Sequence, residues 1–151
     1  MKMHVHHPHF LQVINSIKPI LRVHPPLAVM PYDDLCDWMS WYWNRGTMTW
    51  VADDFGAHGV CLIRLFRDLG QFLDHNIHDP CGKFCFIELL VSDNPITTGQ
   101  LFKGLTDRWG PQQTMMWDRP GRTEDGSPRM YRWDQFMKIA RRVSYGFTEN
   151  A

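Results

Sequence analysis

Glu88 stands out because it is a charged residue in the middle of an apolar run. Residues 83–91 read Lys-Phe-Cys-Phe-Ile-Glu-Leu-Leu-Val, with apolar side chains on both alternations. This pattern is typical of a central strand covered on both faces. A carboxylate in such a strand costs on the order of several kcal/mol unless it is paired or faces a cleft. Glu88 is therefore a candidate general base, and an ion pair with an arginine such as Arg64 is the structural alternative.

His24 is the second candidate for proton transfer. It follows a predicted helix and precedes Pro25 and Pro26, which would hold an exposed imidazole rigidly. Histidine titrates near neutral pH and can act as a general acid or base. A surface histidine with no catalytic task is the alternative.

A possible binding site follows the 83–91 strand, where the chain turns into a helix. Asn94-Pro95 is a typical helix start, with an Asx cap and proline at the first helical position. Backbone N–H groups at a helix start can hold a phosphate or an oxyanion, or the start can simply be capped. The candidate binding residues of this segment are Ser92, Asn94, Thr97, Thr98 and Gly99.

Four possible metal ligands, two histidines and two cysteines, also occur close together, at His75, His78, Cys81 and Cys85. Zinc binds such side chains. However, Cys85 lies inside the predicted strand between two phenylalanines, as core thiols do, and the spacing lacks paired CxxC motifs. We expect no metal, and we expect the four cysteines of the chain to be reduced.

Composition limits the class of protein. The 151 residues carry 16 basic and 16 acidic side chains, and 44% are hydrophobic. This balance predicts a folded domain and no nucleic-acid partner. No apolar run could span a membrane, and the start lacks the apolar core of a signal peptide, so we expect a cytoplasmic protein. Residues 1–9, with four of the eight histidines, are expected to form a tail before a single domain over 10–151.

The elements follow one another in the order helix, helix, strand, strand, strand, helix, strand, helix. The two strands after the second helix form a hairpin across 53–59, a helical turn is expected at 69–74, and 119–129 is expected to be a polar loop. The strand after the crossover helix should lie parallel to the central strand. We predict an α/β fold with a mixed, mostly antiparallel sheet preceded by two helices. The predicted segments are 10–21, 33–43, 47–52, 60–66, 83–91, 95–109, 114–118 and 133–143.

This order, with a carboxylate midway along the central strand, resembles the GNAT acyltransferase superfamily over about residues 32–143. The resemblance implies a single GNAT-like domain that transfers an acyl group from a thioester to an amine. It assigns the general base to Glu88 and the coenzyme A pyrophosphate to the helix start at 94–99.

Within that superfamily, the chain is most similar to the RTX toxin-activating lysine acyltransferases and to phage proteins of similar pattern. The similarity lies in Arg22-Val23-His24-Pro25 and in Phe86-Ile87-Glu88-Leu89-Leu90. It extends to the succession of a helical segment at 101–105 and a strand segment at 117–119. It implies catalytic roles for His24 and Glu88, and either acyl-coenzyme A or an acyl carrier protein thioester as the donor.

A second hypothesis is a catalytically inactive GNAT-like interaction or structural module, such as a phage virion component or a host-directed regulator. The usual Gln/Arg-x-x-Gly-x-Gly/Ala signature is replaced by residues 93–99. The aromatic cluster of Trp38, Trp41, Tyr42 and Trp43 could pack in the core or form a partner surface. This hypothesis predicts a homo-oligomer or a stable protein complex, with a virion location if the chain is phage-encoded.

Overall fold

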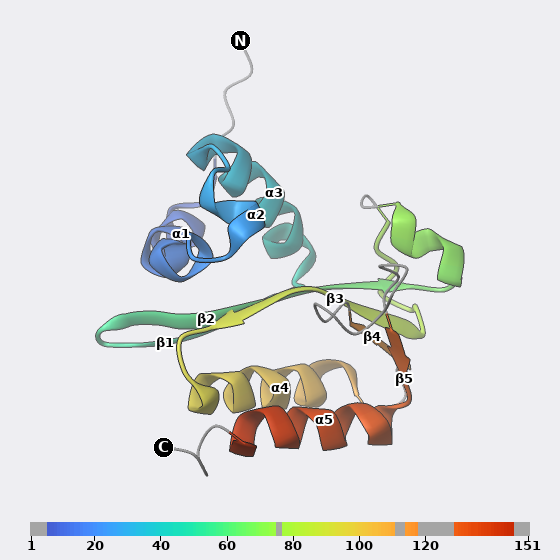
Figure 1. Cartoon of the computed structure of the whole chain (residues 1–151). Coiled ribbons are helices and arrows are strands. Elements are labelled where there is room, and N and C mark those ends of the chain that lie inside the picture. Colours follow the sequence, from blue (N-terminus) through green and yellow to red (C-terminus); the bar gives the residue numbers. More distant parts are fainter. Residues whose placement is uncertain (1–5, 75–76, 111–113, 118–128, 147–151) are drawn as a thin grey trace.

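A computed structural model describes residues 6–74, 77–110, 114–117 and 129–146. These residues form three layers, with a mixed sheet between two groups of helices (Figure 1). Helices α1 to α3 cover one face of the sheet, and α4 and α5 cover the other. Two clusters of buried side chains fill the two interfaces, one on each side of the sheet.

The first helical layer contains α1 (Pro8–Leu21), α2 (Pro25–Ala28) and α3 (Tyr32–Arg45). Phe10, Ile14, Ile17 and Leu21 recur along one face of α1 and are buried against the sheet and α3. This spacing of three and four residues is what makes the helix amphipathic. Helix α3 ends at Gly46, whose φ of +71° suits a glycine in a left-handed helix cap.

The sheet has the strand order β1-β2-β3-β4-β5, and β3 is its central strand. Strands β3 and β4 are parallel, and all other neighbours are antiparallel. The bounds are β1 (Met48–Asp53), β2 (Gly56–Phe66), β3 (Phe84–Ser92), β4 (Thr114–Trp117) and β5 (Arg129–Tyr131), with a short 3-10 helix η1 (Leu69–Leu73) after β2.

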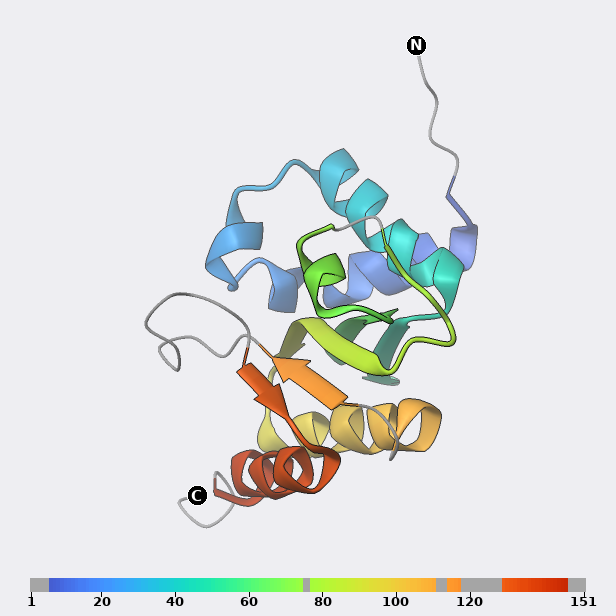
Figure 2. The same cartoon turned by 90° about the vertical axis from the view of Figure 1, so that its right-hand side faces the viewer.

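Helices α4 (Pro95–Trp109) and α5 (Trp133–Gly146) run side by side beneath the sheet (Figure 2). Helix α4 connects β3 to the parallel strand β4, as a crossover helix must. Its buried residues Leu101, Phe102 and Leu105 pack with Phe136 of α5 between the helices and the sheet. Within the described residues, no helix is both long and apolar enough to cross a membrane.

Two register shifts interrupt the pairing of β2. The first lies between Val51 and Ala52 of β1, which pair with Gly59 and Ala57, so that His58 is the extra residue. The second lies opposite Leu62 and Ile63 of β2, which pair with Leu89 and Ile87, so that Glu88 is the extra residue of β3. Such β-bulges change the direction in which a side chain points relative to its neighbours in the strand.

The structure confirms an α/β fold with a mixed sheet, a central strand at 84–92 and a parallel strand after the crossover helix. It corrects several boundaries: α1 begins at Pro8, inside the predicted tail, and β2 begins at Gly56, inside the predicted hairpin connection. Helix α2 is an addition to the two predicted N-terminal helices, and it begins at Pro25 because proline fits the first turn of a helix. Strand β5 lies partly in the predicted polar loop 119–129, most of which is outside the described residues.

Candidate functional site

Glu88 lies at the bulge in the central strand, on the face of the sheet that α3 covers. Its neighbour Ile87 points to the opposite face, into the cluster beneath the sheet. The Glu88 side chain is 11% exposed and its Oε2 lies 3.3 Å from Nε of Arg64. The structural alternative from the sequence, an ion pair with Arg64, is therefore present.

Arg64 fixes the orientation of this carboxylate. The side chain of Arg64 is fully buried, and its Nη1 donates to the carbonyl oxygens of Asp74 at 2.7 Å and Ile77 at 3.4 Å. The guanidinium also lies over the rings of Phe66 and Phe86, with 5.7 and 5.4 Å to the ring centroids. A guanidinium held by several partners is a rigid support for the carboxylate, in a surrounding of low polarity.

Two further titratable side chains, Tyr42 and His78, lie on this face, and no local sequence pattern predicts that they lie near Glu88. Burial and the charge of Glu88 raise the pKa of Tyr42, a buried residue of α3. Burial lowers the pKa of His78, whose Nδ1 accepts a hydrogen bond from the Leu65 amide at 3.1 Å. Because a ring nitrogen that accepts a hydrogen bond carries no proton, this contact places the proton of the neutral ring on Nε2. The Trp41 ring meets both His78 and Tyr42 edge-on, so these three aromatic side chains pack together on this face of the sheet.

His24 lies in the helical layer, at the junction of α1 and α2. It is half-buried rather than exposed, and it occupies the N-cap position of α2 without a capping hydrogen bond from its side chain. The Arg22 guanidinium holds this junction by donating to the carbonyl oxygens of Leu27 at 2.8 Å and Met30 at 2.5 Å. In the part of the chain that the structure describes, no hydrogen bond or ion pair joins His24 to Glu88. The two predicted catalytic residues therefore belong to different layers of the fold.

Four of the five predicted binding residues, Ser92, Asn94, Thr97 and Thr98, come together at the start of α4, where they mainly bond to one another. Asn94 Oδ1 accepts from the Thr97 amide at 2.9 Å, and the Asn94 carbonyl accepts from the Thr98 amide at 3.2 Å. Ser92 Oγ and Thr98 Oγ1 lie 2.5 Å apart. Since Pro95 has no N–H, three of the first four helical positions offer no amide to a ligand. A cavity of about 220 Å³ is nevertheless lined by Ser92, Asp93, Asn94, Pro95 and Thr98.

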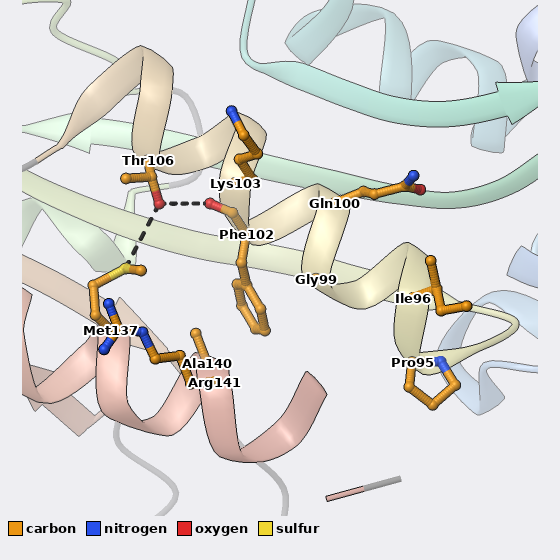
Figure 3. Close-up of a pocket in the computed structure, with 10 residues that line it drawn as sticks. All are labelled: Pro95, Ile96, Gly99, Gln100, Phe102, Lys103, Thr106, Met137, Ala140 and Arg141. Atoms are coloured by element: carbon orange, nitrogen blue, oxygen red, sulfur yellow. Dashed lines mark hydrogen bonds between the residues drawn. The ribbon is translucent and has the colours of Figure 1, made fainter. Parts of the chain in front are cut away.

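Gly99 faces a different space from the other predicted binding residues. It lines a groove of about 500 Å³ between α4 and α5 (Figure 3). The floor of this groove is apolar, and Lys103 and Arg141 carry its positive charges. The groove is a second candidate binding surface, which the sequence did not predict because it depends on how the two helices pack.

His58 is a functional candidate that sequence analysis missed. Its Nδ1 lies 2.6 Å from Asp93 Oδ2, and its Nε2 lies 2.8 Å from Asp53 Oδ2. The carboxylates of Asp93 and Asp53 raise the pKa of His58. Two carboxylates at the two ring nitrogens suit the protonated imidazolium: Nδ1 is within hydrogen-bond reach of Asp93, and Nε2 forms an ion pair with Asp53 without hydrogen-bond geometry. His58 thus ties the β1–β2 hairpin to the junction of β3 and α4, beside the cavity at Asn94.

The possible metal ligands do not assemble in the described residues. His78 lies on the α3 side of the sheet, whereas Cys85 is buried in the cluster on the α4 side. Cys81 is exposed, and His75 lies outside the described residues. Among the residues that the structure describes, no group of three or more His, Cys, Asp or Glu side chains could hold a metal ion. The cysteines are free thiols, and burial raises the pKa of Cys61 to about 12.

The geometry therefore presents three places where chemistry or binding could occur. They are the buried Arg64–Glu88 pair, the His58 contact beside the start of α4, and the groove between α4 and α5. Comparisons of the chain with protein-family models, with curated proteins and with solved structures found no match.

Proposed function

We propose that the protein is a GNAT-like N-acyltransferase, in which Glu88 accepts the proton of the attacking amine. The observation that carries this proposal is the β-bulge at Glu88 in the central strand. A bulge frees a side chain from the regular alternation of a strand and is common beside active sites. The Arg64 guanidinium keeps the carboxylate in one orientation, as a base must be held.

The proposed reaction moves an acyl group from the sulfur of a thioester to the nitrogen of an amine. The amine nitrogen of the acceptor attacks the carbonyl carbon of a thioester, and the amine proton passes to Glu88 directly or through one water molecule. The C–S bond then breaks, the thiolate leaves and takes a proton from solvent, and Glu88 releases its proton to solvent, so that the base is regenerated. His24 is the second candidate for the base, and the start of α4 at Ser92, Asn94, Thr97, Thr98 and Gly99 is the candidate site for the coenzyme A pyrophosphate. The donor is acyl-coenzyme A or an acyl carrier protein thioester.

The first experiment is a thermal-shift series with coenzyme A, acetyl-coenzyme A and a long-chain acyl-coenzyme A. A ligand at about one hundred times its Kd stabilises a folded domain by about 2.7 kcal/mol. Thioester consumption is then followed with amine acceptors. Neither a shift nor consumption with any coenzyme A or carrier-protein thioester would refute the proposal.

The role of Glu88 is tested with Glu88→Gln. The amide oxygen of glutamine can still accept from Arg64 Nε, so we expect this variant to fold and to keep binding the donor. Turnover should fall by about 100- to 10,000-fold, as for the loss of a general base. Asp134→Asn, at an exposed ion pair with Arg132, is the matched control and should keep full turnover. A folded Glu88→Gln variant with full turnover would rule out Glu88 as the base.

A second candidate function is a catalytically inactive interaction module. It is favoured by the start of α4, where the amides of Thr97 and Thr98 already donate to Asn94 and where the Asp93 carboxylate lies beside the cavity. Such a site attracts a pyrophosphate weakly. This candidate predicts a stable oligomer or partner complex together with no thermal shift from any thioester.

A further inference from the structure

The groove between α4 and α5 is an apolar surface with a positive rim. Figure 3 shows Phe102 pointing from α4 toward Ala140 of α5, with Met137 at one end. Ile96, at the other end, is 68% exposed. Lys103 and Arg141 are exposed cations of the same groove, and Lys103 also pairs with Asp107 at 2.7 Å. The groove therefore suits an apolar side chain that carries a negative charge beside it.

The tip of the β1–β2 hairpin has the complementary character. Asp53 pairs with Gly56, so Asp54 and Phe55 form a two-residue turn. Phe55 is 94% exposed, the highest exposure among the large hydrophobic residues that the structure describes. The neighbouring Asp54 is also exposed. An aromatic ring presented to solvent beside a carboxylate is typical of a residue that anchors a protein contact.

The hairpin tip is also held in one conformation. The Phe55 amide donates to Asp53 Oδ1 at 2.8 Å, and the other oxygen of Asp53 lies 2.8 Å from His58 Nε2. Gly56 has a φ of +123°, which a side chain would disfavour. A tip ordered in advance loses little conformational entropy on binding. Because Asp53 is balanced by His58, Asp54 gives the tip its negative charge.

We propose that Phe55 of one copy of this chain inserts into the α4–α5 groove of a second copy, with Asp54 facing Lys103 and Arg141. The tip and the groove are both apolar and carry charges of opposite sign. A groove of about 500 Å³ can also hold a phenyl ring. Both partners are surfaces of the same chain, so no other protein is required. The contact is head-to-tail, and it leaves one tip and one groove for further copies. It does not depend on the acyltransferase proposal.

The test is sedimentation velocity of the full chain, because a small contact gives weak association that requires a high protein concentration. We expect the weight-average mass of the wild type to rise between about 10 μM and about 1 mM. Asp54→Arg and Arg141→Asp should each shift the onset of association to at least about tenfold higher concentration, because each places like charges opposite one another. Far-UV circular dichroism checks that both exposed-site variants fold.

An equimolar mixture of Asp54→Arg and Arg141→Asp gives the decisive result. In the mixture, each tip finds a groove of opposite charge, so association should return to near the wild-type level. Phe55→Ser should weaken association, and Val29→Ser, which changes a residue that is 87% exposed on the helical layer, should not. A wild type that stays monomeric at about 1 mM, or a mixture that stays monomeric, would overturn the proposal and leave the groove to a different partner.

Discussion

His58 Nδ1 lies 2.6 Å from Asp93 Oδ2, which joins the bulged start of β2 to the junction of β3 and α4. Asp53 meets the other ring nitrogen, so both carboxylates stabilise the protonated imidazole. Their combined effect is a pKa of His58 above its ordinary value in the folded state. The contact therefore couples the position of the hairpin to the protonation of one side chain.

Stability should fall as the pH rises through the titration of His58. When folding raises the pKa of a histidine, its protonation stabilises the folded state. This stabilisation is complete below the pKa of the unfolded state, about 6.5, and is lost as the pH rises through the pKa of the folded state. We expect the free energy of unfolding, measured with urea, to decrease from about pH 6.5 upward through the pKa of folded His58. The pKa itself is measured by NMR and should drop in Asp93→Asn.

His58→Gln is the control for this pH dependence. It removes the titrating ring, so its unfolding free energy should change less than that of the wild type over the same pH range. His58 also lowers the pKa of Asp53, and a lowered carboxylate pKa contributes stability that is present above the unfolded value of about 3.9 and is lost as the pH falls. The variant should therefore be less stable than the wild type between about pH 4 and pH 6.5, and the difference should shrink at lower pH. Equal pH dependence in the two proteins would contradict the role given to His58.

Breaking the Arg64–Glu88 pair should destabilise the fold strongly. Arg64→Met removes the partner of a carboxylate that is 11% exposed and leaves the carbonyl oxygens of Asp74 and Ile77 without this donor. The loss of one partner of a buried ion pair typically costs about 3–5 kcal/mol. Urea unfolding of Arg64→Met, Glu88→Leu and the double variant measures the coupling. We expect the double variant to lose clearly less than the sum of the single losses, whereas additive losses would show that the pair is not coupled.

The elements that could be predicted from sequence are those with a strong local pattern. The apolar run of β3 identified the central strand, and Asn94-Pro95 identified the start of α4. Strand β5 could not be predicted, because three residues in a polar stretch become a strand only through their pairing with β4. The Arg64–Glu88 pair was one of two alternatives, and only the packing of β2 against β3 brings these residues together.

The bulges were beyond prediction for a different reason. A one-residue shift depends on both paired strands and on the layers above and below them, so no local pattern marks Glu88 as an extra residue. The flanking residues Gly56 and Gly59 favour a loop at His58, although both glycines belong to β2. Its contact with Asp93 spans 35 residues of sequence, so it could not be identified before the topology was known.

Gly59 should not tolerate a side chain, because β2 approaches α4 closely there. A Cβ at this position would lie 2.7 Å from Thr97 Cγ2, 2.9 Å from the Val91 carbonyl oxygen and 3.1 Å from Leu101 Cδ1. We expect Gly59→Ala to lower the free energy of unfolding by about 1–3 kcal/mol, as overpacking does. Gly70→Ala is the matched control, since nothing lies within 4 Å of its Cβ position. It should be neutral or slightly stabilising, and an equal loss in both variants would argue against a close approach at Gly59.

Two substitutions of Asn94 distinguish a role in capping α4 from a role in binding a ligand at the start of this helix. Asn94→Ala removes the acceptor for the Thr97 amide and should cost about 1 kcal/mol of unfolding free energy. Asn94→Asp retains an N-cap acceptor, but it replaces the Nδ2 donor to Asp93 Oδ1 with a second carboxylate, so we expect it to keep the cap and to lose some stability through charge repulsion. If coenzyme A places its pyrophosphate at this helix start, the added carboxylate should weaken binding at least about tenfold, as measured by calorimetry, and more so at low salt. Equal coenzyme A affinity of Asn94→Asp and the wild type would place the pyrophosphate elsewhere and leave Asn94 with capping alone.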